Sequence, residues 1–164
     1  RIHAEVPELI AGVGTILTPE QAGQAKDAGA SFGVAPGMNP RVVREALKIS
    51  LPFAPGIVTP TDIEQALECG CRLLKFFPAE GSGGIAFLKN MAAPYMHLGL
   101  RYIPLGGLHP GNIEAYMKEP IVHALGGSWI APRDLVAKQD WAAITANARN
   151  ARGLIESIRK GGRA

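Results

Sequence analysis

One pattern recurs along the chain: an apolar run, then one or more small residues, then a helix-like segment that begins with a polar residue and a proline. It is clearest at Thr18-Pro19, Asn39-Pro40 and Thr59-Pro60. Thr and Asn cap the first turn of a helix, and proline fits the next position because that backbone N–H has no partner inside the helix. The apolar runs are therefore predicted to be β-strands, and the segments between them helices.

Six such units follow one another, with 19 residues from Gly37 to Gly56 and 20 from Gly107 to Gly127. Strands that alternate with helices form a parallel sheet covered by helices, so the predicted fold class is α/β. Six units fit either an open doubly wound sheet or part of a (β/α)8 barrel, and the periodicity alone favours neither. The predicted strands cover residues 9–13, 32–34, 52–54, 72–77, 102–104 and 122–125, and the predicted helices cover 20–28, 41–49, 61–68, 85–91, 112–117 and 141–159.

The composition indicates a single globular domain over residues 1–164. Hydrophobic residues make up 47% of the 164 residues, a fraction too high for a disordered chain. The formal net charge is only +3 and no run of five like charges occurs, so nucleic acid is not an expected partner. No apolar stretch approaches the roughly 18 residues of a membrane span, so no membrane partner is expected either.

Two cysteines, Cys69 and Cys71, lie one residue apart, and the four histidines are scattered. No second pair of Cys or His completes a metal site, so no metal is expected. We interpret both thiols as reduced and the protein as cytoplasmic. The chain opens on Arg1-Ile2-His3, which resembles the interior of a helix rather than a signal peptide, and we expect it to be N-terminally truncated.

Lys75 is the most unusual residue, because it lies inside an otherwise apolar run, residues 73–77. On a strand it shares a face with Leu73 and Phe77. A parallel strand is buried on both faces, and burial lowers the pKa of a lysine, which leaves a free amine able to attack a carbonyl carbon. Lys75 is therefore either a nucleophile or a strand-end lysine whose aliphatic stem packs while its ammonium group reaches water.

Glycines close the last two predicted strands, at Gly106-Gly107 and at Gly126-Gly127-Ser128. Glycine lets backbone N–H groups approach an anion closely, and in barrel enzymes the loops after the last two strands frequently bind phosphate. These loops are therefore candidates for a phosphate site. The alternative is that each glycine pair marks only a tight turn and that Ser128 only caps the next turn.

Other candidates also follow strands and are expected at the same mouth. Thr15 is either a contact to a ligand carboxylate or hydroxyl, or a turn hydroxyl. Pro36 ends the second predicted strand. Glu80 is either a proton carrier or a solvated carboxylate, and the Gly-Ser-Gly-Gly sequence of residues 81–84 predicts a flexible loop after it.

Together these segments resemble the bacterial 2-dehydro-3-deoxy-phosphogluconate and 4-hydroxy-2-oxoglutarate aldolases (KDPG/KHG aldolases). Residues 75–80, Lys-Phe-Phe-Pro-Ala-Glu, with Gly83-Gly84 after them, resemble the Schiff-base segment of that family. The other loops resemble its remaining motifs in the same order, namely Gly12-Val13-Gly14-Thr15, Pro36-Gly37, Pro55-Gly56, Gly106-Gly107 and Gly126-Gly127-Ser128-Trp129. The resemblance covers essentially the whole chain.

The resemblance implies a (β/α)8 TIM barrel, of which this chain supplies the third to eighth βα units. It also implies a cytosolic homotrimer that acts without metal or cofactor on a small keto-acid sugar phosphate. The family cleaves 2-dehydro-3-deoxy-6-phosphogluconate to pyruvate and glyceraldehyde 3-phosphate, or 4-hydroxy-2-oxoglutarate to pyruvate and glyoxylate. The implied roles are imine formation for Lys75, carboxylate binding for Thr15, pocket lining for Pro36 and Phe77, and phosphate binding for Gly106, Gly107, Gly127 and Ser128.

Two departures from the family pattern bear on activity. The family begins with two further βα units, whose second strand carries a glutamate proton shuttle and a nearby arginine. Neither unit is in this sequence, so the 164-residue chain is expected to be impaired as an enzyme. The family also usually carries Thr before the first glycine pair, where this chain has Leu105. Related phosphogalactonate aldolases carry an aliphatic residue there, which leaves the stereochemistry of the substrate open.

Two other functions stay open at this point. One is a phosphate-binding barrel isomerase or epimerase in which Lys75 is only an electrostatic contact. The other is a sugar-phosphate-binding domain without catalysis. Trapping of an imine separates the aldolase from both.

Overall fold

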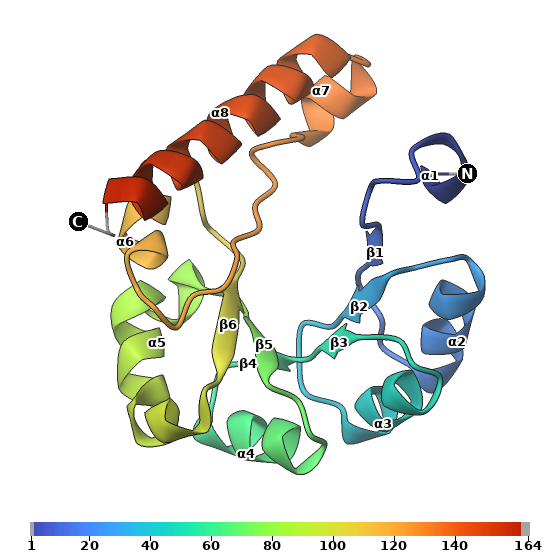
Figure 1. The fold of residues 1–164 in the computed structure, drawn as a ribbon, viewed down its shortest axis with the longest axis vertical. Helices are drawn as coiled ribbons and strands as arrows, with labels where there is room; N and C mark the ends of the chain where they lie inside the picture. The colour runs from blue at the N-terminus through green and yellow to red at the C-terminus, as the bar shows by residue number, and fades with distance from the viewer. Residues whose placement is uncertain (1, 162–164) are drawn as a thin grey trace.

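The computed structural model describes residues 2–161 and confirms the alternation of strands and helices (Figure 1). The strands are β1 (Gly12–Val13), β2 (Phe32–Val34), β3 (Phe53–Ala54), β4 (Gly56–Ile57), β5 (Leu73–Phe76) and β6 (Arg101–Pro104). The helices are α1 (Ile2–Glu5), α2 (Pro19–Asp27), α3 (Pro40–Lys48), α4 (Pro60–Glu68), α5 (Gly84–Ala92), α6 (Ile113–Met117), α7 (Arg133–Ala137) and α8 (Trp141–Gly161), with 3-10 turns η1 (Glu80–Ser82) and η2 (Ala93–Leu98).

The predicted caps begin three of the helices. The Thr18 side chain accepts a hydrogen bond from the Gln21 N–H, and the Gln21 side chain accepts one from the Thr18 N–H. Thr59 and Asp62 form the same reciprocal pair at α4, and Asn39 caps α3. Each cap contributes about 1 kcal/mol. The caps therefore fix where the chain turns from each strand into the following helix.

All the paired strands are parallel and form two three-stranded sheets, β1-β2-β3 and β4-β5-β6. The predicted strand at 52–54 extends to Ile57, but Pro55 interrupts it because proline has no N–H for a ladder. Its first half pairs with β2 and its second half with β5. Figure 1 shows the strands curving as an arc, with α2 to α5 on the outer side.

The sixth predicted strand, residues 122–125, is only partly formed. It runs parallel to β6 and is joined to it by one isolated bridge, between Tyr102 and Val122, and a second isolated bridge joins the residues that follow, Leu105 and Gly126. The Tyr102 N–H of β6 donates to the carbonyl of Ile121, just before this segment, but the next N–H on that side would belong to Pro104, which has none. The carbonyl of His123 instead accepts a hydrogen bond from the guanidinium of Arg159 on α8, at 2.9 Å. Pro104 therefore interrupts the hydrogen-bond ladder between β6 and this segment. A hydrogen bond from Arg159 of α8 takes the place of the missing one.

Residues of β5 alternate between the core and the opposite face of the sheet. Leu74 and Phe76 are fully buried, and the Phe76 ring stacks on Phe87 of α5, with ring centroids 6.2 Å apart. Lys75 points to the other face, where its nitrogen lies over the ring of Phe77. This alternation confirms the expected face-sharing of Lys75 and Phe77. The strand thus anchors itself in the core with one face and presents Lys75 with the other.

The backbone of Pro36 passes so close to Gly56 of β4 that no side chain fits at this position. A methyl group at Gly56 would lie 2.0 Å from the carbonyl oxygen of Pro36, which belongs to the backbone and cannot rotate away. Gly56→Ala is therefore expected to lower the free energy of unfolding by about 1–3 kcal/mol or more, measured by urea denaturation. Gly37→Ala is the matched control, because its added methyl group meets nothing within 4 Å. Equal effects of the two substitutions would contradict this interpretation.

Candidate active site

A pocket of about 560 Å³ opens where β5 and β6 end. Six of the eight predicted site residues line it: Lys75, Phe77, Gly106, Gly107, Gly127 and Ser128. The remaining lining residues are Leu105, Leu108 and Gly126. The parallel sheet brings these residues together because the carboxyl ends of its strands share one edge. The candidate nucleophile and the two candidate phosphate loops therefore share one cavity.

Thr15 and Pro36 do not line this pocket. Thr15 is exposed after β1, and Pro36 is half-buried after β2, with its carbonyl packed against Gly56. Both follow strands of the first sheet at its carboxyl edge, whereas the pocket lies on the second sheet and the segment beside it. Their predicted contacts to a substrate stay predictions.

Lys75 is buried in the pocket wall, with 8% of its surface exposed. Its register partners are Gly56 on one side and Ile103 on the other, so it has no charged neighbour across the sheet. Burial disfavours the ammonium form and lowers the pKa of Lys75 below its usual value. Its nitrogen lies 4.8 Å from the centre of the Phe77 ring, and no ion pair joins it to a carboxylate within residues 2–161. Such a lysine supplies more free amine near neutral pH than an exposed one.

The lowered pKa predicts how imine formation depends on pH. The rate of trapping of a keto acid on Lys75 is expected to rise with pH and to reach half its plateau below the ordinary lysine value of about 10.4, because only the neutral amine attacks. Phe77→Leu is expected to move the midpoint further down, since the aromatic ring favours the ammonium form. A midpoint at or above 10.4 would show that burial does not act on this amine.

Hydrogen bonds accepted by carbonyl groups hold the Gly106–Gly107 turn in place. Both glycines have left-handed backbone conformations, with φ of 99° and 79°. The carbonyl of Leu105 accepts from the Ala79 N–H at 2.8 Å, and the Gly106 carbonyl accepts from the Glu80 N–H at 3.0 Å. The loop after β5 and the loop after β6 are thereby joined.

The N–H groups of this turn are free to bind an anion. In a trans peptide the N–H points opposite to the carbonyl of the preceding residue. Because the Leu105 and Gly106 carbonyls point toward the loop after β5, the N–H groups of Gly106 and Gly107 point away from that loop. Within the described chain, the N–H groups of Gly106, Gly107 and Leu108 donate no hydrogen bond, and neither do those of Gly127 and Ser128. These residues line one pocket, and unpaired backbone N–H groups of this kind can donate to a phosphate.

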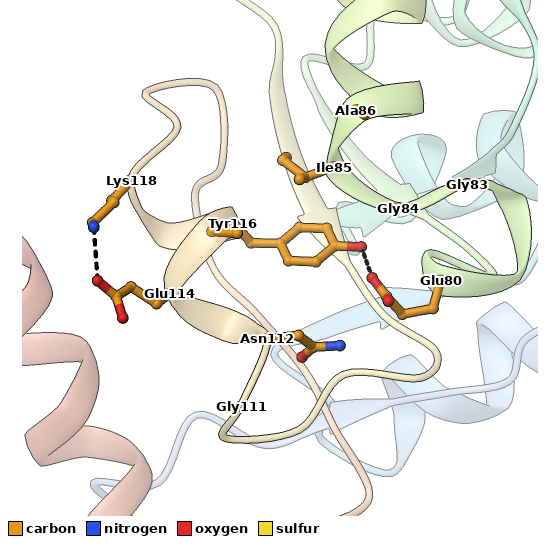
Figure 2. A pocket seen from close by; sticks show the side chains of 11 residues that line it. Glu80, Gly83, Gly84, Ile85, Ala86, Gly111, Asn112, Glu114, Tyr116 and Lys118 are labelled. Carbon is orange, nitrogen blue, oxygen red and sulfur yellow. Dashed lines mark hydrogen bonds and ion pairs between the residues drawn. The ribbon is translucent and has the colours of Figure 1, made fainter.

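Glu80 lies outside the pocket, and the flexible loop predicted after it is a folded turn. Residues 80–82 form η1, and α5 begins at Gly84. The Glu80 carboxylate accepts a hydrogen bond from the hydroxyl of Tyr116 on α6 (Figure 2). Figure 2 places it in a neighbouring cleft of about 700 Å³ between α5 and α6. The structure therefore does not place this carboxylate beside Lys75.

Sequence reasoning missed Asn112, which lies just before α6, and Tyr116 of α6. The Asn112 side chain donates to the Gly107 carbonyl at 3.1 Å and accepts from the His109 N–H at 2.8 Å. The available signal was their spacing of four residues within the helix predicted over residues 112–117. In the structure Asn112 lies just before α6.

Metal sites and membrane-spanning helices are both absent from the part of the chain that the structure describes. No group of three or more His, Cys, Asp and Glu side chains there could hold a metal ion. None of the described helices has the length and hydropathy needed to cross a membrane.

Comparison with known proteins identifies the family. The family model for KDPG and KHG aldolase matches residues 1–147, which is most of the chain. The chain belongs to the KDPG and KHG aldolase family. Within this family, 2-dehydro-3-deoxy-phosphogluconate aldolase from Treponema pallidum is 46% identical over 145 residues, which cover 88% of this chain and 68% of the relative.

Solved structures agree with the family assignment. The KDPG aldolase of Legionella pneumophila, with pyruvate captured as a covalent carbinolamine, matches with a TM-score of 0.84 and 32% identity over 89% of this chain and 70% of that one. A KDPGal structure matches with a TM-score of 0.72 and 27% identity over 93% and 74%. The described residues therefore form about six βα units of the (β/α)8 barrel of KDPG/KHG aldolases.

Proposed function

We propose that this member of the KDPG/KHG aldolase family is a class I aldolase that cleaves a phosphorylated 2-keto-3-deoxy sugar acid, and 4-hydroxy-2-oxoglutarate, to pyruvate and an aldehyde. The observation that carries the proposal is Lys75: it is buried, has no carboxylate partner among the described residues, and shares its pocket with unpaired N–H groups. Family membership supports the same reaction.

The chemistry follows from what a buried amine can do. The neutral nitrogen of Lys75 attacks the C2 carbonyl carbon, and the resulting carbinolamine loses water to give a protonated imine. Cleavage of the C3–C4 bond leaves its electron pair in an enamine, while the C4 hydroxyl group gives up its proton and becomes the aldehyde. Protonation of C3 and addition of water then release pyruvate and restore the amine. The proton acceptor is not supplied by any carboxylate that lines the described pocket.

Imine trapping tests this proposal directly. Incubation with pyruvate and borohydride is expected to reduce the imine and to add mass to the peptide that contains Lys75 and to no other peptide. Labelling of another lysine, or of none, would refute the aldolase assignment and leave an isomerase or a binding domain. Isomerase activity without trapping would favour the former, and ligand binding without turnover the latter.

A phosphogalactonate-type aldolase is the second candidate, and Leu105 is the residue that favours it. Leu105 lines the pocket beside Gly106, where an aliphatic side chain cannot donate a hydrogen bond to a substrate hydroxyl. The similarity to a KDPGal structure supports this alternative. Trapping rates with the two C4 epimers of the phosphorylated keto acid distinguish the candidates, since a gluconate-type site favours one epimer and a galactonate-type site the other.

The phosphate part of the proposal needs a probe other than a glycine. Gly107→Val would distort the turn itself, because Gly107 has a positive φ and an added methyl group would lie 2.7 Å from Glu80 Cβ. Ser128→Asp instead places a negative charge at an exposed position on the pocket wall. It is expected to raise the half-saturating concentration of phosphorylated substrate roughly tenfold or more by charge repulsion, and that of pyruvate far less. Ser157→Asp on α8 is the control, and equal losses for both ligands would contradict a phosphate site.

We also propose a cytoplasmic homotrimer. The resemblance to the KDPG/KHG aldolases supports both statements. Sedimentation equilibrium tests the assembly, and a monomer at micromolar concentration would contradict it.

A further inference from the structure

We propose that Tyr116 is a positioning residue for the phosphate-binding turn Gly106–Gly107, and that it acts through Glu80. The inference rests on the proposed phosphate site. It adds contacts outside the pocket that hold the turn in place and so favour phosphorylated substrates. It assigns Glu80 a role other than proton transfer. These contacts form a chain that starts on α6 and ends at the turn.

The first contact joins α6 to η1. Tyr116 is almost fully buried, with 1% of its surface exposed, and its hydroxyl donates to Glu80 Oε1 (Figure 2). Burial first, and then the hydrogen bond to Glu80, raise the pKa of Tyr116 well above its usual range. The hydroxyl therefore stays protonated, and remains a donor, across the neutral and moderately basic pH range.

The second contact joins Glu80 to the turn. The Glu80 N–H donates to the Gly106 carbonyl at 3.0 Å, and the Glu80 side-chain stem covers Gly107. A methyl group at Gly107 would lie 2.7 Å from Cβ and 2.9 Å from Cγ of Glu80. A glutamate fixed by Tyr116 therefore leaves the Gly107 backbone little room to move.

Asn112, the residue just before α6, holds the turn from the other side. Its side chain holds the Gly107 carbonyl, as Glu80 holds the Gly106 carbonyl. Because peptide units are planar, fixing these two carbonyls fixes the direction of the N–H groups of Gly107 and Leu108. Loss of the Tyr116 hydrogen bond frees the Glu80 side chain and loosens one of the two supports. Lys75 has no part in these contacts, so imine formation with pyruvate does not depend on them.

Tyr116→Phe tests the proposal, because it keeps the buried ring and removes only the donor. Cyanoborohydride reduces an imine in preference to a free keto acid, so trapping on Lys75 gives both a half-saturating concentration and a maximal rate. For 2-dehydro-3-deoxy-6-phosphogluconate, Tyr116→Phe is expected to raise the half-saturating concentration about three- to tenfold, with the maximal rate unchanged. For pyruvate neither quantity is expected to change. The dissociation constant of inorganic phosphate, measured by calorimetry, is expected to rise by the same factor.

Further variants separate positioning from proton transfer and from general stability. Glu80→Gln keeps an oxygen that accepts from Tyr116, so it is expected to retain the phosphate affinity. If Glu80 were a proton carrier instead, the same variant would lose proton transfer, because an amide does not replace a carboxylate as a base. Glu80→Ala removes the stem over Gly107 as well as the hydrogen bond, so it is expected to lower the phosphate affinity at least as much as Tyr116→Phe, and the double variant to be no worse than Glu80→Ala alone. Tyr95→Phe is the matched control, since it removes another tyrosine–glutamate hydrogen bond, to Glu64 at 2.8 Å, away from the pocket.

The outcomes are distinct. Equal losses for pyruvate and for the phosphorylated substrate, or no change in either, would overturn the positioning role. A wild-type chain that binds phosphate but traps no pyruvate would refute the aldolase proposal, while the phosphate affinity of Tyr116→Phe would still decide the positioning role. A wild-type chain that binds no phosphate would overturn the positioning role together with the phosphate site.

Discussion

Replacing Lys75 with arginine is expected to abolish labelling by pyruvate and borohydride and to lower the rate of substrate cleavage by roughly 10⁴-fold or more. The guanidinium group stays protonated at every accessible pH and cannot attack a carbonyl carbon. Removal of a covalent nucleophile costs up to about 10⁶ in kcat in enzymes where it has been isolated. Mass spectrometry of the tryptic peptide and a coupled assay of pyruvate release measure the two effects.

The control for this variant is Lys89→Arg. Lys89 is exposed on α5 and forms an ion pair with Glu119 at 2.6 Å, so it is held by a carboxylate and lies outside the pocket. Its replacement is expected to leave labelling unchanged. A Lys75→Arg protein that folds, as judged by its circular dichroism spectrum, and still incorporates pyruvate would show that another amine is the nucleophile.

The second large effect concerns proton transfer in the 164-residue chain. Once the imine has formed, conversion to the enamine removes a proton from C3 of bound pyruvate, which needs a positioned base. No aspartate or glutamate lines the pocket among the described residues, and the Glu80 carboxylate faces the neighbouring cleft. Exchange of the pyruvate methyl protons into deuterated water is therefore expected to be about 10²–10⁴-fold slower than in a chain extended at its N-terminus by the two first βα units of a family member. Nuclear magnetic resonance follows the exchange.

The Treponema pallidum relative is a suitable donor of these units, since it is 46% identical over the matched region, which is 68% of its length. Imine trapping on Lys75 reports separately that each chain binds pyruvate. An extended chain whose family glutamate is replaced by glutamine is expected to exchange as slowly as the 164-residue chain. Equal exchange in the unmodified extended chain and the 164-residue chain would place the base inside this sequence and contradict the prediction.

Local patterns were enough to predict the caps that begin α2, α3 and α4 and the unusual position of Lys75. A cap such as Thr59 depends on Asp62, three residues away, and the face that Lys75 shares with Phe77 depends only on strand geometry. The ordered loop motifs also placed six residues in one pocket correctly, because parallel strands bring their carboxyl ends to one edge. The roles of those residues in binding and catalysis stay predictions.

Contacts between distant residues decided the rest. The Glu80 loop looks flexible in sequence because it is rich in glycine, yet it is held by Tyr116, 36 residues away, and by Gly106. Residues 122–125 are as apolar as a strand, but Pro104 of the neighbouring strand removes the donor that would complete the ladder. The amino-acid sequence by itself determined where strands and helices alternate and which lysine is desolvated, since both depend on residues within a few positions. Only the tertiary structure decided that the Glu80 carboxylate faces the neighbouring cleft and which N–H groups are free, since both depend on hydrogen-bond partners from other units of the fold.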